Sequence, residues 1–113
     1  MDCIFCKIAA GEIPATLLHE DAHLVAFQDI HPQAPTHVLV VPRKHIPSLN
    51  ALTSDDAALV GRLVLEGARL AAEQNLSGTG YRMVLNCGAW AGQTVDHLHL
   101  HVLGGRRLGW PPG

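Results

Sequence analysis

Residues 97–103 run His-Leu-His-Leu-His-Val-Leu, a strict alternation of imidazole and aliphatic side chains. Alternate side chains of a β-strand share a face, so the pattern predicts a strand with three imidazoles on one side and core residues on the other. Residues on one face lie about 6.6 Å apart at a rise of ~3.3 Å per residue. His97, His99 and His101 are therefore expected to line a groove about 13 Å long, comparable with a phosphate and its two flanking groups.

The alternation alone leaves two chemical interpretations open. A solvated strand that happens to be rich in histidine is disfavoured, because the opposite face is uniformly apolar. His-x-His on a strand occurs at catalytic metal sites. Neutral imidazole is also an effective nucleophile toward phosphorus at physiological pH. The alternation of histidine and aliphatic residues fits metal binding and nucleophilic catalysis equally well.

The flanking segments favour the nucleophile. Gly92-Gln93-Thr94 comes just before the histidines, where glycine lets backbone N–H groups approach an anion and Thr94 can donate a hydrogen bond. Asn86 ends the preceding predicted strand and is a candidate phosphate donor. Asp96 is the one carboxylate in this segment. A hydrolytic metal site usually needs an acid as ligand or base, so the metal interpretation loses ground.

The rest of the sequence predicts an α+β fold in a single domain over residues 1–113, with a mainly antiparallel sheet, one short helix and one long helix. The short helix is expected over 3–10, and the long one to about Gln74, with N-cap candidates and early acids at 53–56. Asn75 and Gly78 suit its exit. Further strands are expected at 17–18, 24–27, 38–41 and 81–85, with a proline-containing loop at 31–35.

Charge and composition exclude some classes of partner. Eight basic residues are balanced by ten acidic ones, for a net charge of −2, and no basic run forms a surface for nucleic acid. No apolar run is long enough to span a membrane, and no targeting segment is recognisable. A cytoplasmic location is expected. Three cysteines are an odd number, so Cys3 and Cys6 suggest a metal pair rather than a disulfide.

At this point the chain resembles the histidine-triad superfamily. The alternating run is similar to its signature, and further motifs are similar to its Hint branch of nucleotide-binding proteins: Ala34-Pro35-Thr36-His37, Gly92-Gln93-Thr94, Gly104-Gly105-Arg106 and Trp110-Pro111-Pro112-Gly113. The last motif favours this branch over dinucleoside polyphosphate hydrolases. The resemblance covers Cys3 to Gly113. It implies the histidine-triad fold and hydrolysis of purine nucleoside phosphoramidates through a covalent nucleotidyl-histidine.

The resemblance also implies the catalytic roles. His99 is the expected nucleophile, and His101 is expected to contact the non-bridging phosphate oxygens. Thr94 stands where the family usually has serine and is expected to donate a hydrogen bond to the departing amine. His37 and His97 are similar to the pair of histidines that orients the site. Asn86 resembles the asparagine that contacts the phosphate.

A nucleoside site follows from the same resemblance. Asp29 matches the carboxylate that accepts hydrogen bonds from the ribose hydroxyls, although a turn aspartate before Pro32 is the plainer interpretation from the residues alone. Phe5, Ile13, Phe27 and Ile30 resemble an apolar purine slot. The phosphate end of the nucleotide is expected to contact Asn86, Gly92, Gln93, Thr94, His99 and His101. Gln28 and His31 depart from the animal members.

Two further expectations concern a metal and a partner. Cys3-x-x-Cys6 has the spacing of a zinc half-site, and the chain matches bacterial family members in placing His45 and His97 as further candidate ligands. Four protein ligands leave no open position, so the zinc is expected to be structural, with no catalytic metal. The alternative is a pair of partly buried free thiols. The family precedent also implies a symmetric homodimer through the long helix and a sheet edge, with the tail of Trp110 near the partner's active site.

Two hypotheses compete with the phosphoramidase: a nucleotide-binding regulatory protein with incidental hydrolysis, and a dinucleoside polyphosphate hydrolase.

Overall fold

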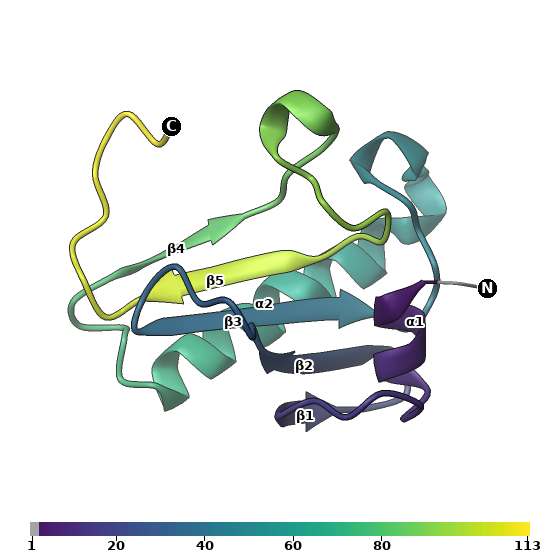
Figure 1. The fold of residues 1–113 in the computed structure, drawn as a ribbon, viewed down its shortest axis with the longest axis horizontal. Helices are drawn as coiled ribbons and strands as arrows, with labels where there is room; N and C mark the ends of the chain where they lie inside the picture. The colour runs from purple at the N-terminus through teal and green to yellow at the C-terminus, as the bar shows by residue number, and fades with distance from the viewer. Residues whose placement is uncertain (1–2) are drawn as a thin grey trace.

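The computed structural model describes residues 3–113 and shows a sheet between two helices (Figure 1). In chain order the elements are α1 (Ile4–Ala9), β1 (Leu17–Glu20), β2 (Leu24–Gln28), β3 (Thr36–Pro42), α2 (Ala57–Glu73), β4 (Tyr81–Val84) and β5 (Leu100–Gly104). Short 3₁₀ turns lie at Leu49–Ala51, Ser54–Asp56 and Ala89–Ala91. Over residues 3–113 the strands form one antiparallel sheet in the order β1-β2-β3-β5-β4. The predicted α+β class is confirmed.

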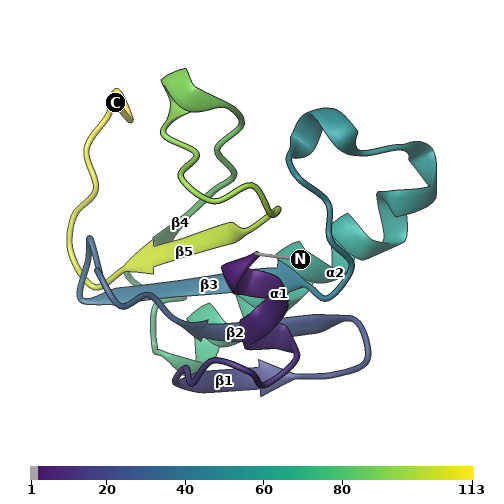
Figure 2. The same cartoon turned by 45° about the vertical axis from the view of Figure 1, so that its right-hand side comes forward.

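Each face of the sheet carries its own apolar cluster. Along β3, Val38 and Val40 face α2, where they join a cluster that includes Leu63 and Leu70. The residue between them, Leu39, faces the other way into a smaller cluster that the helix α1 covers. This alternation is the period of two that a buried strand requires. Figures 1 and 2 show α2 behind the sheet and α1 against its front.

The long helix begins and ends where the sequence predicts. The Thr53 hydroxyl accepts a hydrogen bond from the Asp55 N–H, while the Thr53 N–H donates to the Asp56 carboxylate, which forms a capping box on the 3₁₀ turn Ser54–Asp56 that leads into α2. Lys44 donates to the same buried Asp56 over 2.7 Å and so ties the segment after β3 to the start of α2. At the other end Asn75 takes a positive φ of 61°, which ends the helix.

One edge of the sheet is flanked by exposed aromatic residues. β4 is an edge strand, and the loop 88–92 and the C-terminal tail both project beyond it (Figures 1 and 2). Trp90 on the loop is fully exposed and Trp110 on the tail is 82% exposed. Over residues 3–113, the helices are all too short or too polar to cross a lipid bilayer.

Candidate active site

The three alternating histidines share one face, but they do not share one strand. Leu98, Leu100 and Val102 lie in the core beneath α2, as predicted. The predicted strand 97–103 is wrong at its start, because β5 begins only at Leu100. Pro42, which would stand opposite Leu98, has no N–H to donate across the ladder, and the Leu98 N–H donates to the Ile46 carbonyl over 2.6 Å rather than to β3. His97 and His99 therefore sit in an irregular segment that precedes the strand.

His99 is held with one ring nitrogen free to act as a nucleophile. Its Nδ1 lies 2.7 Å from the carbonyl oxygen of His97. A carbonyl oxygen only accepts, so Nδ1 carries the proton and the lone pair of the neutral ring is on Nε2. The ring is 7% exposed and packs edge-on against Phe5, with centroids 5.1 Å apart. The structure thus fixes both the orientation and the tautomer of this side chain.

His37 and His101 are joined by a hydrogen bond whose direction can be worked out. The main-chain N–H of Gln33 donates to His37 Nδ1 over 3.0 Å, so the proton of neutral His37 is on Nε2. That nitrogen lies 2.8 Å from Nδ1 of His101 and donates to it. His101 then carries its own proton on Nε2. The two neighbouring histidines therefore offer opposite functions: His99 a lone pair, His101 an N–H donor.

Burial keeps several of these rings neutral. It lowers the pKa of His37, although the negative charge of Asp29 partly opposes the shift. It also lowers the pKa of His97. The pKa of His101 falls to about 4, chiefly through burial and further through repulsion from His99 and His37. At neutral pH His101 is consequently a hydrogen-bond donor without a net charge.

Asp29 lies beside this histidine pair. It follows β2, and its Oδ2 is 3.4 Å from His37 Nε2. Its Oδ1 accepts a hydrogen bond from the main-chain N–H of His31 over 2.8 Å, the turn contact that the residues alone suggest. Asp29 therefore holds its own loop and still presents a carboxylate next to His37 and His101.

Most of the predicted purine slot lies together. Phe5 and Phe27 pack with ring centroids 5.5 Å apart in the cluster beneath α1, and Ile13 packs against that cluster. Ile30 lies apart from it, with 82% of its surface exposed. Phe5 also contacts His97 and so joins the apolar cluster to the histidine segment.

The loop before the triad is held mainly by Gln93. Its Oε1 accepts from the Gly88 N–H over 2.9 Å, and its Nε2 donates to the carbonyls of Pro47 and Val95 over 2.8 and 3.0 Å. Both polar atoms of the Gln93 side-chain amide therefore have hydrogen-bond partners within the protein. Gly92 adopts φ of +87°, which a residue with a side chain rarely does. Thr94 is exposed and Asn86 is half-buried.

The predicted metal ligands converge. One ligand atom each from Cys3, Cys6, His45 and His97 lies within 4.8 Å of all the others. Nδ1 of His97 is 3.2 Å from Cys3 Sγ and 3.1 Å from His45 Nδ1, and Cys6 Sγ is 3.3 Å from His45 Nδ1. The cluster joins α1 to the segments that follow β3 and precede β5.

The donor set fits a tetrahedral zinc ion. Bonds of ~2.3 Å to sulfur and ~2.0–2.1 Å to nitrogen place ligand atoms roughly 3.3–3.8 Å apart, close to the distances in this cluster. Nε2 of His97 lies 2.8 Å from the Pro42 carbonyl and donates to it, so the Nδ1 lone pair faces the cluster. Burial, together with the adjacent Cys3, raises the pKa of the Cys6 thiol.

The pattern of side chains did not predict the main-chain groups that orient the site. The Gln33 N–H sets the tautomer of His37, and the Pro42 carbonyl sets that of His97. Every residue carries these groups, so they leave no residue-type signal. The available hint was the position of Gln33 between Pro32 and Pro35, in a loop with few N–H donors.

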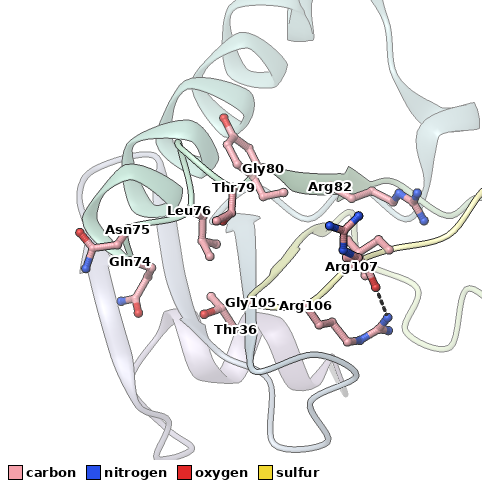
Figure 3. A pocket seen from close by; sticks show the side chains of 12 residues that line it. Thr36, Gln74, Asn75, Leu76, Thr79, Gly80, Arg82, Gly105, Arg106 and Arg107 are labelled. Atoms are coloured by element: carbon pink, nitrogen blue, oxygen red, sulfur yellow. Dashed lines mark hydrogen bonds between the residues drawn. The ribbon is translucent and has the colours of Figure 1, made fainter.

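Cavity volume and chemistry point to different places. A hollow of about 940 Å³ opens where β4 begins and β5 ends, and its walls include Arg82, Arg106 and Arg107 but no histidine (Figure 3). A smaller depression of about 120 Å³ is lined by Asp29 and His37 among others. Neither His99 nor His101 lines that depression, so we place the candidate site by its chemistry, where the rings of His37, His99 and His101 meet.

Comparison with known proteins identifies related chains. A family model described as "Scavenger mRNA decapping enzyme C-term binding" matches residues 2–108. An uncharacterized HIT-like protein of Synechocystis sp. is 52% identical over 112 residues, covering 99% of this chain and 97% of the relative. The crystal structure of a HIT family hydrolase from Legionella pneumophila is 51% identical, with a TM-score of 0.98, and covers 99% of this chain and 100% of that one.

Two more distant structures carry names that bear on ligands. A histidine triad nucleotide-binding protein from Candida albicans is 34% identical with a TM-score of 0.83, covering 97% of this chain and 83% of that one. A Zn-bound histidine triad family protein from Mycobacterium smegmatis is 34% identical with a TM-score of 0.82, covering 100% of this chain and 81% of that one.

Proposed function

This chain belongs to the histidine-triad (HIT-like) family, and on that premise we propose that it hydrolyses purine nucleoside phosphoramidates by way of a nucleotidyl group carried on His99. The observation that carries this proposal is the pair of opposite tautomers: a lone pair on His99 Nε2 beside an N–H on His101 Nε2. Hydrolase and nucleotide-binding relatives of the same fold support it.

In the first half of the reaction, His99 Nε2 donates its lone pair to phosphorus and the bond from phosphorus to the leaving nitrogen breaks. The leaving nitrogen takes up a proton from solvent, and the exposed Thr94 hydroxyl is assigned to hydrogen-bond to it. The Nδ1–H of His99 donates to the His97 carbonyl throughout, which stabilises the positive charge that develops on the ring. The His101 Nε2–H donates to a non-bridging oxygen, where negative charge grows.

In the second half, a water oxygen attacks the phosphorus of the adduct and the bond from His99 Nε2 to phosphorus breaks. Nε2 regains its lone pair and the water loses a proton to solvent. The products are the amine and the nucleoside monophosphate. Asp29 is assigned to the ribose hydroxyls, and Phe5, Ile13 and Phe27 to the purine, with the exposed Ile30 able to cover it from the loop side. Asn86 and the main chain of Gly92 and Gln93 are assigned to the phosphate.

The direct test is incubation of the purified protein with adenosine 5′-phosphoramidate, with release of adenosine monophosphate as the measured quantity. The rate is expected to fall by roughly 10³-fold or more in His99→Ala, because the nucleophile is lost. His23→Ala is the matched control: this histidine is exposed and lies outside the site, and its rate should equal that of the wild type. Rapid quenching and intact mass measurement should show one adenylyl group on the wild-type chain. A wild-type rate in His99→Ala would refute the assignment.

Two alternative functions are separated by the same assay. A nucleotide-binding protein with incidental hydrolysis would bind nucleoside monophosphate and turn over the phosphoramidate no faster than buffer. A dinucleoside polyphosphate hydrolase would prefer diadenosine polyphosphate when the two substrates are compared directly.

We also propose that Cys3, Cys6, His45 and His97 hold a structural zinc ion. Bound zinc would supply no open coordination position for substrate; it would fix α1 and the segment before β5. Metal analysis of the purified, reduced protein should find one equivalent of zinc, and only traces of zinc would remove the proposal.

A symmetric homodimer is the third part of the proposal. We assign the interface to the open edge of β4 and to α2, where the exposed apolar residues include Trp90, Trp110 and Leu65. Light scattering coupled to size-exclusion chromatography should give twice the chain mass. A monomer at micromolar concentration would contradict it.

A further inference from the structure

We propose that Arg106 is a positioning residue for His101: by holding the Gln33 carbonyl, it fixes the tautomers of His37 and His101. The inference rests on the proposed function for its catalytic consequence, but its structural part stands independently. Arg106 belongs to the Gly104-Gly105-Arg106 segment that follows β5, and the site residues described above do not include it.

The first step is the pair of bonds that clamp Gln33. Its N–H points inward and donates to His37 Nδ1 over 3.0 Å. Its carbonyl accepts from Nη2 of Arg106 over 3.0 Å, a contact between residues 73 positions apart in the chain. The two main-chain groups of one residue are thus held from opposite sides. The two groups belong to the two peptide units that flank the Cα of Gln33, so together the bonds hold both peptide units next to His37 in place.

The second step is the loop itself, which has few other ways to stay in place. Pro32 and Pro35 provide no N–H donors. Within the loop, Gln33 Nε2 donates to the His31 carbonyl over 3.0 Å, and the His31 N–H donates to Asp29. These bonds shape the loop locally. The Arg106 contact comes from beyond the loop and anchors it to the end of the sheet.

The third step is the close approach that brings Arg106 within reach. Gly105 has φ of +90°, and a Cβ built there would lie 2.8 Å from Cβ of Pro35. The chain after β5 therefore packs directly on the loop, which only glycine allows. Figure 3 shows Arg106 beside Thr36 with its guanidinium turned back to the Arg107 carbonyl, to which Nη1 donates over 3.0 Å. One planar guanidinium holds two carbonyls at once, which a lysine ammonium does with less geometric constraint.

The consequence reaches the reaction centre through the histidine pair. With Gln33 in place, His37 donates from Nε2 and His101 must accept on Nδ1, leaving an N–H on Nε2. If the hydrogen bond from the Gln33 N–H is lost, His37 can carry its proton on Nδ1 and offer Nε2 as the acceptor. His101 then donates to His37 and turns a lone pair toward the phosphate oxygens. A donor that stabilises developing negative charge is replaced by a repulsive acceptor.

The test compares Arg106→Ala, Arg106→Lys and Arg107→Ala with the wild type, all as the full chain. Arg107→Ala is the matched control, because it removes the same charge one residue away, and Arg107 donates no hydrogen bond to the loop in the structure. Long-range ¹H–¹⁵N correlation spectra of the imidazoles at neutral pH report which nitrogen carries the proton. We expect His37 and His101 to be Nε2–H tautomers in the wild type and in Arg107→Ala. In Arg106→Ala we expect shifts toward the Nδ1–H form, and in Arg106→Lys an intermediate result.

The kinetic arm uses the phosphoramidate substrate. Losing one exposed hydrogen bond should lower kcat about three- to tenfold in Arg106→Ala while KM changes less than about twofold. Arg107→Ala should keep the wild-type kcat, and thermal denaturation should confirm that all variants are folded. Unchanged tautomers in Arg106→Ala would overturn the inference, whatever happens to kcat. Shifted tautomers in a chain without phosphoramidase activity would leave the positioning role standing and refute the proposed function alone.

Discussion

The carbonyl oxygen of His97 accepts a hydrogen bond from Nδ1 of His99 over 2.7 Å, so a residue of the Cys/His cluster determines where the proposed nucleophile carries its proton. The His97 ring is completely buried, with one nitrogen facing the cysteines and the other bonded to the Pro42 carbonyl. Because the ring cannot turn, the main chain that bears this carbonyl is held as well. The cluster and the reaction centre are therefore mechanically connected through a single residue.

This connection predicts the effect of removing one cysteine. Cys6→Ser should lower the zinc content and reduce the free energy of unfolding by about 3 kcal/mol or more, because a structural metal contributes its binding energy to folding. Cys87→Ser is the control, since Cys87 is half-buried outside the cluster and should leave the metal content unchanged. Metal analysis and urea denaturation measure the two effects. Equal zinc content in the two variants would contradict the ligand assignment.

The lowered pKa of His101 predicts how stability depends on pH. This pKa is about 4 in the folded chain and ~6.5 in an unfolded chain. Between these values the unfolded state binds more protons, so the contribution of His101 is fully present above pH ~6.5 and is lost progressively toward pH 4. The free energy of unfolding of the wild type should therefore fall more steeply over this range than that of His101→Gln. Urea denaturation at a series of pH values measures both slopes, and identical slopes would refute the prediction.

The sequence pattern predicted which side of the sheet each triad residue occupies, but not the spacing of the rings. Alternation depends on side-chain hydrophobicity, and Leu98 and Leu100 entered the core accordingly. The expected separation of about 6.6 Å assumed a regular strand. The ring centroids of His99 and His101 are 4.9 Å apart, and His99 lies just outside the paired part of the strand, which starts with Leu100 opposite Val40.

Contacts between side chains could be predicted from sequence motifs, whereas contacts with main-chain groups could not. Cys3 and Cys6 could be recognised as a half-site from their spacing, and the resemblance to bacterial family members supplied His45 and His97. The main-chain partners of the imidazoles could not be predicted from the sequence, since the carbonyl of His97 or the N–H of Gln33 is chemically the same as any other main-chain group. Only the folded path of the chain selects them.

Gln93 shows a further difference between pattern and structure, and it leads to a prediction. Its side chain bridges three main-chain groups of its own and a neighbouring loop. Gln93→Ala should reduce the free energy of unfolding by about 1–2 kcal/mol, as expected for losing these bonds at a partly exposed site. Gln28→Ala is the control, because Gln28 is exposed at the end of β2. Urea denaturation measures both. If Gln93→Ala weakens nucleotide binding with no loss of stability, the side chain contacts the ligand directly.

The packing of α2 against the sheet predicts opposite effects for the same substitution at two glycines of one helix. At Gly61 an added Cβ meets nothing within 4 Å, so Gly61→Ala should raise the free energy of unfolding by about 0.5–1 kcal/mol through the helix propensity of alanine. At Gly67 the added Cβ would lie 2.9 Å from Cε of Met83 and 3.1 Å from Cδ2 of Leu100.

Gly67→Ala should therefore lower the free energy of unfolding by about 1–3 kcal/mol, because the side chains of Met83 and Leu100 on β4 and β5 must shift to admit the methyl group. Leu100 immediately precedes His101, so the same displacement should also lower kcat in Gly67→Ala but not in Gly61→Ala. Urea denaturation and phosphoramidate turnover of the two variants test both parts. A stabilised Gly67→Ala would mean that Met83 and Leu100 yield without cost, and that the contact between helix and sheet does not hold His101 in place.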